Sequence, residues 1–211
     1  KATGEISAGA GIGTTGGTIA FTVKENNYVG KGIKLNASLS LGSDTVRGIF
    51  AVTNPNFNYS DRALTTSVES RVTDKLTVNG YKTSKTGLAF STNFEQYKDF
   101  YISPEISLYL ENIETNTAAS SSLQKQKGDF FDSNFNYALN LDKRNQAHQP
   151  SEGFRSLFRQ ELPLVADDNT IKNSYELNAH HEFIEDMIGS FTFFTSAVHS
   201  LANEDVRISK R

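Results

Sequence analysis

The sequence contains no cysteine among its 211 residues. Disulfide bonds and thiolate metal sites are therefore excluded, although a cell-envelope protein can lack cysteine as readily as a cytosolic one. The sequence also lacks any apolar run of about 18 residues, so it contains no membrane-spanning helix. The chain begins at Lys1 without a charged and then apolar leader, so we expect any signal peptide to lie upstream.

An excess of positive charge is also lacking. The formal net charge is -3, and Lys and Arg are spread along the chain rather than gathered in one patch. This distribution gives no electrostatic reason to expect a nucleic-acid partner.

Strict alternation of apolar and polar residues is what the sequence does contain. From Ile33 to Leu41 every odd position is apolar and every even position is polar. A period of two predicts a β-strand with one face toward an apolar environment and one toward water. The polar break Gly42-Ser43-Asp44 and a second strand from Val46 to Val52 complete an antiparallel hairpin.

The same pattern predicts eleven strands in one all-β domain without long helices. The predicted fold class is an antiparallel up-and-down transmembrane β-barrel, in which strands of about 9–11 residues cross the membrane with a tilt. We expect short turns at one rim and longer loops at the other. The polar segment 114–127 is predicted to be a loop or a short helix. The predicted strands are 4–13, 18–24, 33–41, 46–52, 64–72, 83–94, 101–112, 131–142, 154–162, 174–184 and 190–201.

A soluble sandwich or a soluble lipid-binding barrel would show the same period. A soluble barrel needs a packed interior and a polar exterior, so long strands with polar inward faces favour the membrane barrel. Aromatic residues close to the turns are expected to form its girdle at one rim. These residues are Tyr28, Phe57, Tyr59, Tyr97, Phe100 and Tyr101.

Two patterns that suggest chemistry are rejected by their context. The stretch from Gly11 to Gly16 matches a dinucleotide fingerprint, but that fingerprint needs a helix after the last glycine and a strand is predicted there. His180 and His181 are adjacent on a strand and point to opposite faces, so they cannot chelate one metal together, and we expect a structural role for them and for His199. We therefore expect no enzyme activity, no cofactor and no metal.

Three turn motifs are more specific when they are taken together. Turn residues recur after the second, fourth and eighth predicted strands, and they are Asn27, Gly30, Gly32, Asn54, Pro55, Phe57, Asp142, Arg144, Pro150 and Gly153. In this spacing the chain resembles, over essentially its whole length, the BamA family of outer-membrane assembly factors in the bacterial surface antigen superfamily. Pro and Gly also form turns in any β-protein, so each motif alone carries little information.

The resemblance implies a sixteen-stranded barrel that follows periplasmic domains. Residues 1–211 would then be the N-terminal two-thirds of one outer-membrane barrel domain, with the periplasmic domains and the final strands outside it. The family also has an inward-folded loop with an Arg-Gly-Phe type motif after the eleventh strand. The segment from Val206 to Arg211 resembles the approach to that loop.

The function that the resemblance implies is the assembly and insertion of β-barrel proteins into the outer membrane of a Gram-negative bacterium. Its implied partners are client outer-membrane proteins, outer-membrane lipid and lipopolysaccharide, and accessory lipoproteins bound through the periplasmic domains. The alternative is a secretion or transport pore of the same superfamily.

In the resembled family the first strand meets the last at a lateral gate, where a client strand is added. Gly4 to Gly13 suits this role because small side chains give little cross-strand contact and leave the backbone edge available. Alternatively, these glycines only relieve curvature at a barrel edge. The predicted pairing site is the backbone of Glu5, Ile6, Ser7, Ala8, Gly9, Ala10, Gly11 and Ile12.

Overall fold

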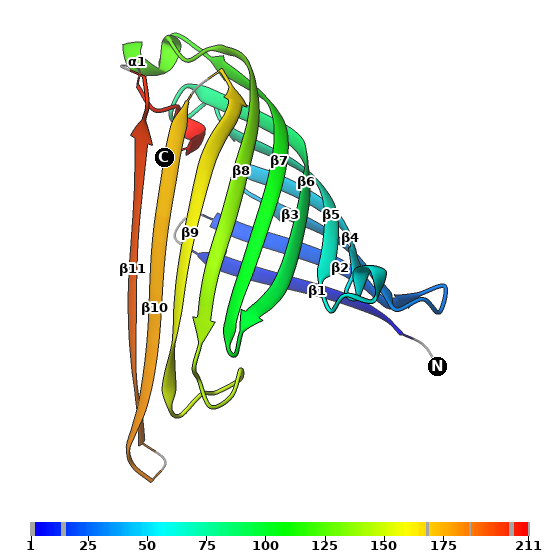
Figure 1. Cartoon of the computed structure of the whole chain (residues 1–211). Coiled ribbons are helices and arrows are strands. Elements are labelled where there is room, and N and C mark those ends of the chain that lie inside the picture. The colour runs from blue at the N-terminus through cyan, green and yellow to red at the C-terminus, as the bar shows by residue number, and fades with distance from the viewer. Residues whose placement is uncertain (1–2, 14–15, 168, 186, 203–204, 211) are drawn as a thin grey trace.

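The computed structural model contains one eleven-stranded antiparallel sheet (Figure 1). It describes residues 3–13, 16–167, 169–185, 187–202 and 205–210. Thr14, Thr15 and Arg211, which belong to two of the sequence motifs above, lie outside the described residues. The strands are β1 (Gly4–Gly13), β2 (Gly16–Tyr28), β3 (Ile33–Gly42), β4 (Thr45–Asn54), β5 (Ala63–Lys75), β6 (Tyr81–Tyr97), β7 (Phe100–Thr115), β8 (Gly128–Asp142), β9 (Gly153–Ala166), β10 (Thr170–Ile184) and β11 (Met187–Ser200).

Each strand pairs with the strands that precede and follow it in the sequence, so the spatial order is β1 to β11. Within the described part of the chain, β1 pairs only with β2 and β11 pairs only with β10, and the sheet is open. The predicted all-β, up-and-down antiparallel fold is confirmed. The β2 strand that begins at Gly16 also confirms that no helix follows the glycine-rich stretch.

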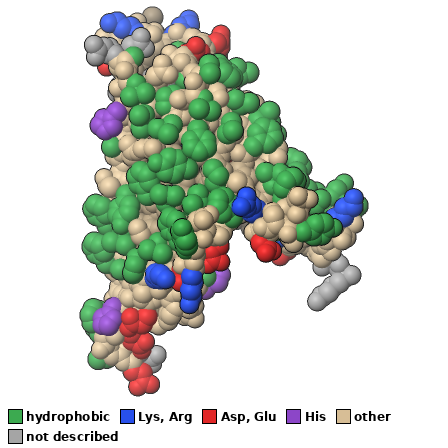
Figure 2. Space-filling model, viewed as in Figure 1, with side chains coloured by type: hydrophobic (Ala, Val, Ile, Leu, Met, Phe, Trp, Pro, Cys, Tyr) green, Lys and Arg blue, Asp and Glu red, His purple; other side chains and the backbone are tan. Residues whose placement is uncertain are grey.

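The register places the alternating apolar residues of neighbouring strands on one face. Leu39 of β3, for example, lies opposite Phe21 of β2 and Gly48 of β4. Side chains of this face are open to the surroundings: Phe50 is 48% exposed and Ile106 is also 48% exposed. Figure 2 shows apolar side chains covering much of one outer surface of the sheet.

The opposite face is polar and concave, because side chains as far apart as Thr65 of β5 and Ser174 of β10 line one hollow on it. The buried apolar residues of the described chain are Ala89, Ile113, Ala119 and Leu157. Four such residues do not make the closed apolar core that a soluble barrel requires. The predicted orientation of the apolar face is confirmed, because apolar side chains face outward and polar side chains line the concave face.

The helices are short. They are α1 (Ser121–Gln124) and the 3₁₀ turns η1 (Phe57–Tyr59) and η2 (Ile208–Lys210). In the described ranges no helix combines the length and the apolar content needed to traverse a lipid bilayer. The α1 helix lies in the predicted polar segment 114–127, where Ser120 Oγ accepts a hydrogen bond from the Leu123 N–H at 3.3 Å.

Two details of the prediction were wrong. The strands are 10 to 17 residues long, and most are longer than the alternating runs. The ladder continues through polar residues because backbone hydrogen bonds, unlike the apolar face, do not require apolar side chains. The rims also do not differ in loop length: the long connection 116–127 lies at one rim and the long connection 143–152 at the other.

All six predicted girdle aromatics lie at one rim, around the connections that follow β2, β4 and β6. Tyr28 and Phe100 are on the apolar face, directly opposite Ile33 and Leu141. Tyr101 differs, because its register partner Asn140 is on the concave face. It therefore does not belong to an outward girdle.

The turn residues have the backbone geometry that their types favour. Gly30, Gly32 and Gly153 adopt φ values of 70°, 69° and 92°, where a side chain would be strained. Asn27 Oδ1 accepts a hydrogen bond from the Gly32 N–H at 2.6 Å, and Asn54 Oδ1 accepts one from the Asn56 N–H at 3.2 Å.

The turn between β8 and β9 contains an additional ion pair. Arg144 donates two hydrogen bonds to the carboxylate of Asp142, at 2.8 and 2.7 Å. This paired geometry fixes the start of the connection 143–152, in which Pro150 also lies. Pro55 and Phe57 lie in the connection from β4 to β5.

Candidate functional site

The first candidate site is the edge of β1. Its ten residues, Gly4–Gly13, pair with β2 from end to end, and all ten are exposed. Ile6 and Ile12 of the apolar face are 85% and 95% exposed. The eight residues from Glu5 to Ile12 therefore present a backbone edge and two open faces.

Contacts between the side chains of β1 and β2 are small. Ala8 lies opposite Phe21, Gly9 opposite Ala20, and Gly11 opposite Thr18. A Cβ atom added at Gly9 or Gly11 would meet no other atom within 4 Å, so these glycines do not make room for a neighbour. Backbone hydrogen bonds thus hold β1 to β2 with little help from side chains.

The N-terminal end of β1 is held by more hydrogen bonds than its middle. Thr3 and Glu25 share a side-chain hydrogen bond, and Asn26 donates its backbone N–H to the Thr3 carbonyl at 3.2 Å. These contacts anchor the start of the strand and leave the stretch from Ile6 to Ile12 as its weakly held part.

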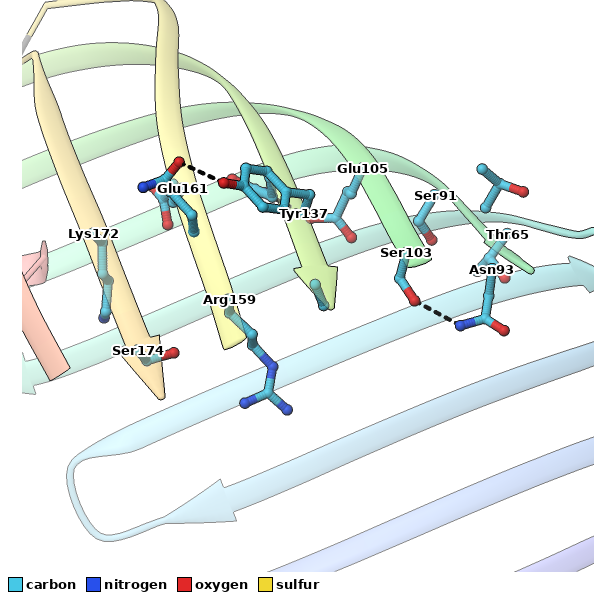
Figure 3. A pocket seen from close by; sticks show the side chains of 14 residues that line it. Thr65, Ser91, Asn93, Ser103, Glu105, Tyr137, Arg159, Glu161, Lys172 and Ser174 are labelled. Atoms are coloured by element: carbon cyan, nitrogen blue, oxygen red, sulfur yellow. Dashed lines mark hydrogen bonds between the residues drawn. The ribbon is translucent and has the colours of Figure 1, made fainter. Parts of the chain in front are cut away.

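The second candidate site is the concave face. A hollow of about 470 Å³ extends along it from β5 to β10. Figure 3 shows polar side chains of these strands around the hollow, among them Glu105, Arg159 and Lys172. Asn93 donates a hydrogen bond to Ser103 Oγ at 2.6 Å on its wall. A surface with this chemistry is suited to contact with water and polar solutes.

The segment after β11 enters the concave face and buries an arginine there. Arg207 is 3% exposed, and its guanidinium lies 3.0 Å from Glu111 Oε2 of β7 and 2.5 and 2.6 Å from the two oxygens of Asp132 of β8. Lys210 Nζ lies 3.3 Å from Asp132 Oδ1, and Ser209 Oγ donates to Glu111 Oε2 at 2.8 Å.

Further contacts fix the same segment. The Arg207 guanidinium lies over the ring of Phe130, 4.4 Å from its centre, and the Ile208 N–H donates to Gln126 Oε1 at 2.9 Å. Figure 1 shows this segment near the end of the sheet at which α1 lies. The segment is thereby fixed to β7, β8 and the connection between them.

Sequence reasoning identified Val206 to Arg211 only as the approach to an inward loop and did not identify the carboxylates that hold Arg207. Glu111 and Asp132 are inward positions of strands that the alternation predicted. The sequence did indicate that these carboxylates face inward and that Arg207 lies in a segment resembling the approach to an inward loop. Many other carboxylates face the same way, so this signal did not select these two.

The histidines lie on different faces, as the alternation predicts. His180 Nδ1 lies 2.9 Å from Ser190 Oγ, whereas His181 Nδ1 lies 3.1 Å from Glu152 Oε1. The hydrogen bond from His181, helped by the Glu182 N–H, lowers the pKa of the Glu152 carboxyl from its ordinary value. Among residues with a described position, no group of three or more His, Asp or Glu could hold a metal ion.

Comparisons with known proteins agree with this geometry. A family model described as the Omp85 superfamily domain matches residues 27–211. The crystal structure of BamA from Haemophilus ducreyi lacking POTRA domains 1–3 is similar with a TM-score of 0.88 and 15% sequence identity. The similarity covers 99% of this chain and 43% of that chain, so this chain spans less than half of its length. No curated protein matches the sequence.

Proposed function

Because the chain belongs to the Omp85 superfamily, we propose that it is barrel sequence of a protein that inserts β-barrel proteins into the bacterial outer membrane. Within the superfamily we place it with the BamA-type assembly factors, as the N-terminal two-thirds of one barrel domain. The matched fold supports this placement, and the match to BamA extends over β1 although the family model begins at residue 27.

The edge of β1 is the observation that carries the proposal. In lipid every backbone N–H and C=O must be paired, and each unpaired group costs several kcal/mol. Among the described residues β1 pairs only with β2, and its small side chains leave the other backbone edge accessible, so an incoming strand can pair along that edge at small cost. We propose that the backbone from Glu5 to Ile12 receives the terminal strand of a client at a lateral gate.

The proposed mechanism requires no cofactor and no catalytic turnover. Strand addition exchanges one set of hydrogen bonds for another, so its net free energy is small. Folding of the client, which buries its own apolar face in lipid, supplies the driving force. The proposed partners are client outer-membrane proteins, outer-membrane lipid including lipopolysaccharide, and accessory lipoproteins bound by periplasmic domains.

Cysteine crosslinking tests this function. Cysteines at Ile6, Ala8 or Ile12 of the full-length protein are expected to form disulfides with cysteines in the terminal strand of a client during insertion, because the paired strands would lie about 5 Å apart. This chain has no other cysteine to interfere.

A cysteine at Phe50 is the matched control. It lies on the same face as Ile6, but β4 is paired on both sides, so no client strand can be added beside it. Failure of all three β1 positions to crosslink, or equal crosslinking at Phe50, would reject strand addition at β1.

A second function, a secretion or transport pore of the same superfamily, is favoured by the polar hollow on the concave face. The number of periplasmic repeats before the barrel separates the two: five indicate an assembly factor, three the related translocation and assembly module, and two a secretion pore. In liposomes, a pore is expected to pass small solutes without a client, and an insertase is expected to accelerate client folding.

A further inference from the structure

Three basic residues lie side by side across the concave face. Arg47 of β4 is directly opposite Arg71 of β5, and Arg71 is directly opposite Lys85 of β6. The row ends at Glu111 of β7, which is directly opposite Lys85. Directly opposed residues in an antiparallel sheet have Cβ atoms about 4.5–5.5 Å apart, and like charges at that spacing destabilise the pairing.

The acidic residues around this row are already engaged. Glu69 accepts a hydrogen bond from Arg47 Nε at 2.7 Å, and Glu111 is held by Arg207 at 3.0 Å. The ammonium of Lys85 lies 4.2 Å from the centre of the Tyr109 ring. Among the described residues, neither Arg71 nor Lys85 has a carboxylate within ion-pair distance. The centre of the row is therefore an uncompensated pair of cations.

A hollow of about 420 Å³ lies over this pair. Two more cations, Lys75 of β5 and Lys172 of β10, also line it, and no described carboxylate forms an ion pair with either. The two carboxylates on its wall are the engaged Glu69 and Glu111. Ile208 and hydroxyl groups complete the lining, and the hydroxyl groups belong to Thr45, Thr73, Tyr81, Thr83, Tyr109 and Ser209.

We propose that this hollow binds an anion that carries phosphate groups. Guanidinium and ammonium groups donate charge-assisted hydrogen bonds to phosphate oxygens, and the fork of Arg71 matches two oxygens of one phosphate. Hydroxyl groups can donate to the remaining oxygens. A bound phosphate would convert the repulsion between Arg71 and Lys85 into attraction for a shared ligand. The phosphate can belong to a lipid headgroup or to a free phosphate compound.

The site is separate from the edge of β1 and does not depend on strand addition. The simplest competing explanation is that the row is the solvated wall of a water-filled lumen. In that case each cation would act independently, and removing any cation from the concave face would have a similar small effect. A binding site would instead lose affinity for the anion mainly when Arg71 or Lys85 is replaced.

The test uses the full-length protein in an uncharged detergent at about 0.1 M salt, where charges interact over roughly 10 Å. Binding of inorganic pyrophosphate and of short-chain phosphatidic acid is measured by calorimetry for the wild type, Arg71→Gln and Lys85→Gln. Each variant is expected to bind at least about tenfold more weakly, because each loses charge-assisted hydrogen bonds. Lys34→Gln removes the same charge from the concave face of β3, where Thr53 is the register partner, and is expected to bind as the wild type does.

Thermal unfolding provides a second measurement. Pyrophosphate is expected to raise the melting temperature of the wild type and of Lys34→Gln but not that of Arg71→Gln. Without any anion, Arg71→Gln is expected to melt no lower than the wild type, because the substitution removes a repulsion. A variant that merely failed to fold would melt lower, so a folding defect is recognisable.

The two ligands distinguish the sources of the phosphate. Binding of both supports a site for phosphate groups in general, binding of pyrophosphate alone supports a free phosphate compound, and binding of phosphatidic acid alone supports a lipid headgroup. No binding of either ligand to the wild type, or an equal loss in Lys34→Gln, would overturn the proposal.

Discussion

Replacing Arg207 with methionine is expected to destabilise the protein by about 3–5 kcal/mol, the range found when one member of a buried ion pair is removed. Arg207 is 3% exposed, and the side chains of Glu111 and Asp132 are 2% and 1% exposed. Methionine fills most of the volume but leaves two carboxylates in a site that excludes water. Lys210, 3.3 Å from Asp132, can compensate only one of them.

Urea unfolding of the full-length protein in detergent, with hydrogen exchange of residues 205–210, measures this effect. Lys143→Met is the control, because the Lys143–Asp99 pair is also short, at 2.8 Å, but has side chains 44% and 34% exposed. An exposed pair contributes about 0.2–1 kcal/mol. Arg207→Lys keeps the charge and is expected to fall between the two. Equal effects of Arg207→Met and Lys143→Met would show that the buried cluster does not hold the segment.

Replacing Gly153 with alanine is expected to destabilise the protein by about 2–6 kcal/mol, the sum of two costs. Gly153 begins β9 with φ at +92°, which costs a residue with a side chain about 1–3 kcal/mol. Its added Cβ would also lie 2.2 Å from the Lys143 carbonyl oxygen, which is backbone and cannot rotate away. Forcing the two strands apart adds a cost of about 1–3 kcal/mol.

Gly30→Ala separates the two causes. Gly30 also has a positive φ, +70°, but a Cβ there would meet nothing within 4 Å. It is therefore expected to show only backbone strain, about 1–2 kcal/mol. Both variants are compared by urea unfolding of the full-length protein. If Gly153→Ala costs no more than Gly30→Ala, the close approach between Gly153 and Lys143 is not a constraint on the turn.

The alternation of apolar and polar residues along the chain was enough to predict most of the fold. Ile33 to Leu41 predicted a strand, an apolar face and a polar face, and the structure confirms all three. The reason is physical: successive side chains of a strand point to opposite faces, so the face of a residue follows from its position alone. The prediction that the apolar face points outward followed from the same property.

The ends of the strands were less predictable. Strand β6 continues from the expected Thr83–Phe94 to Tyr81–Tyr97, because polar residues beyond the apolar run keep their backbone pairing. The sequence marks where the apolar face stops, and it does not mark where the hydrogen-bonded ladder stops. The lengths of the loops at the two rims were also misjudged, because the long connection 143–152 lies at the rim where short turns were expected.

Within the alternating runs the sequence by itself determined which residues face inward and which face outward, because between bulges the face follows from parity along the strand. Only the tertiary structure decided which inward residues meet. Arg207 reaches Glu111 and Asp132 across 96 and 75 residues of sequence, and Arg47, Arg71 and Lys85 form a row only in the register observed. Register is a property of pairs of strands, set by turn geometry and by packing between strands, and a pattern within one strand cannot specify it.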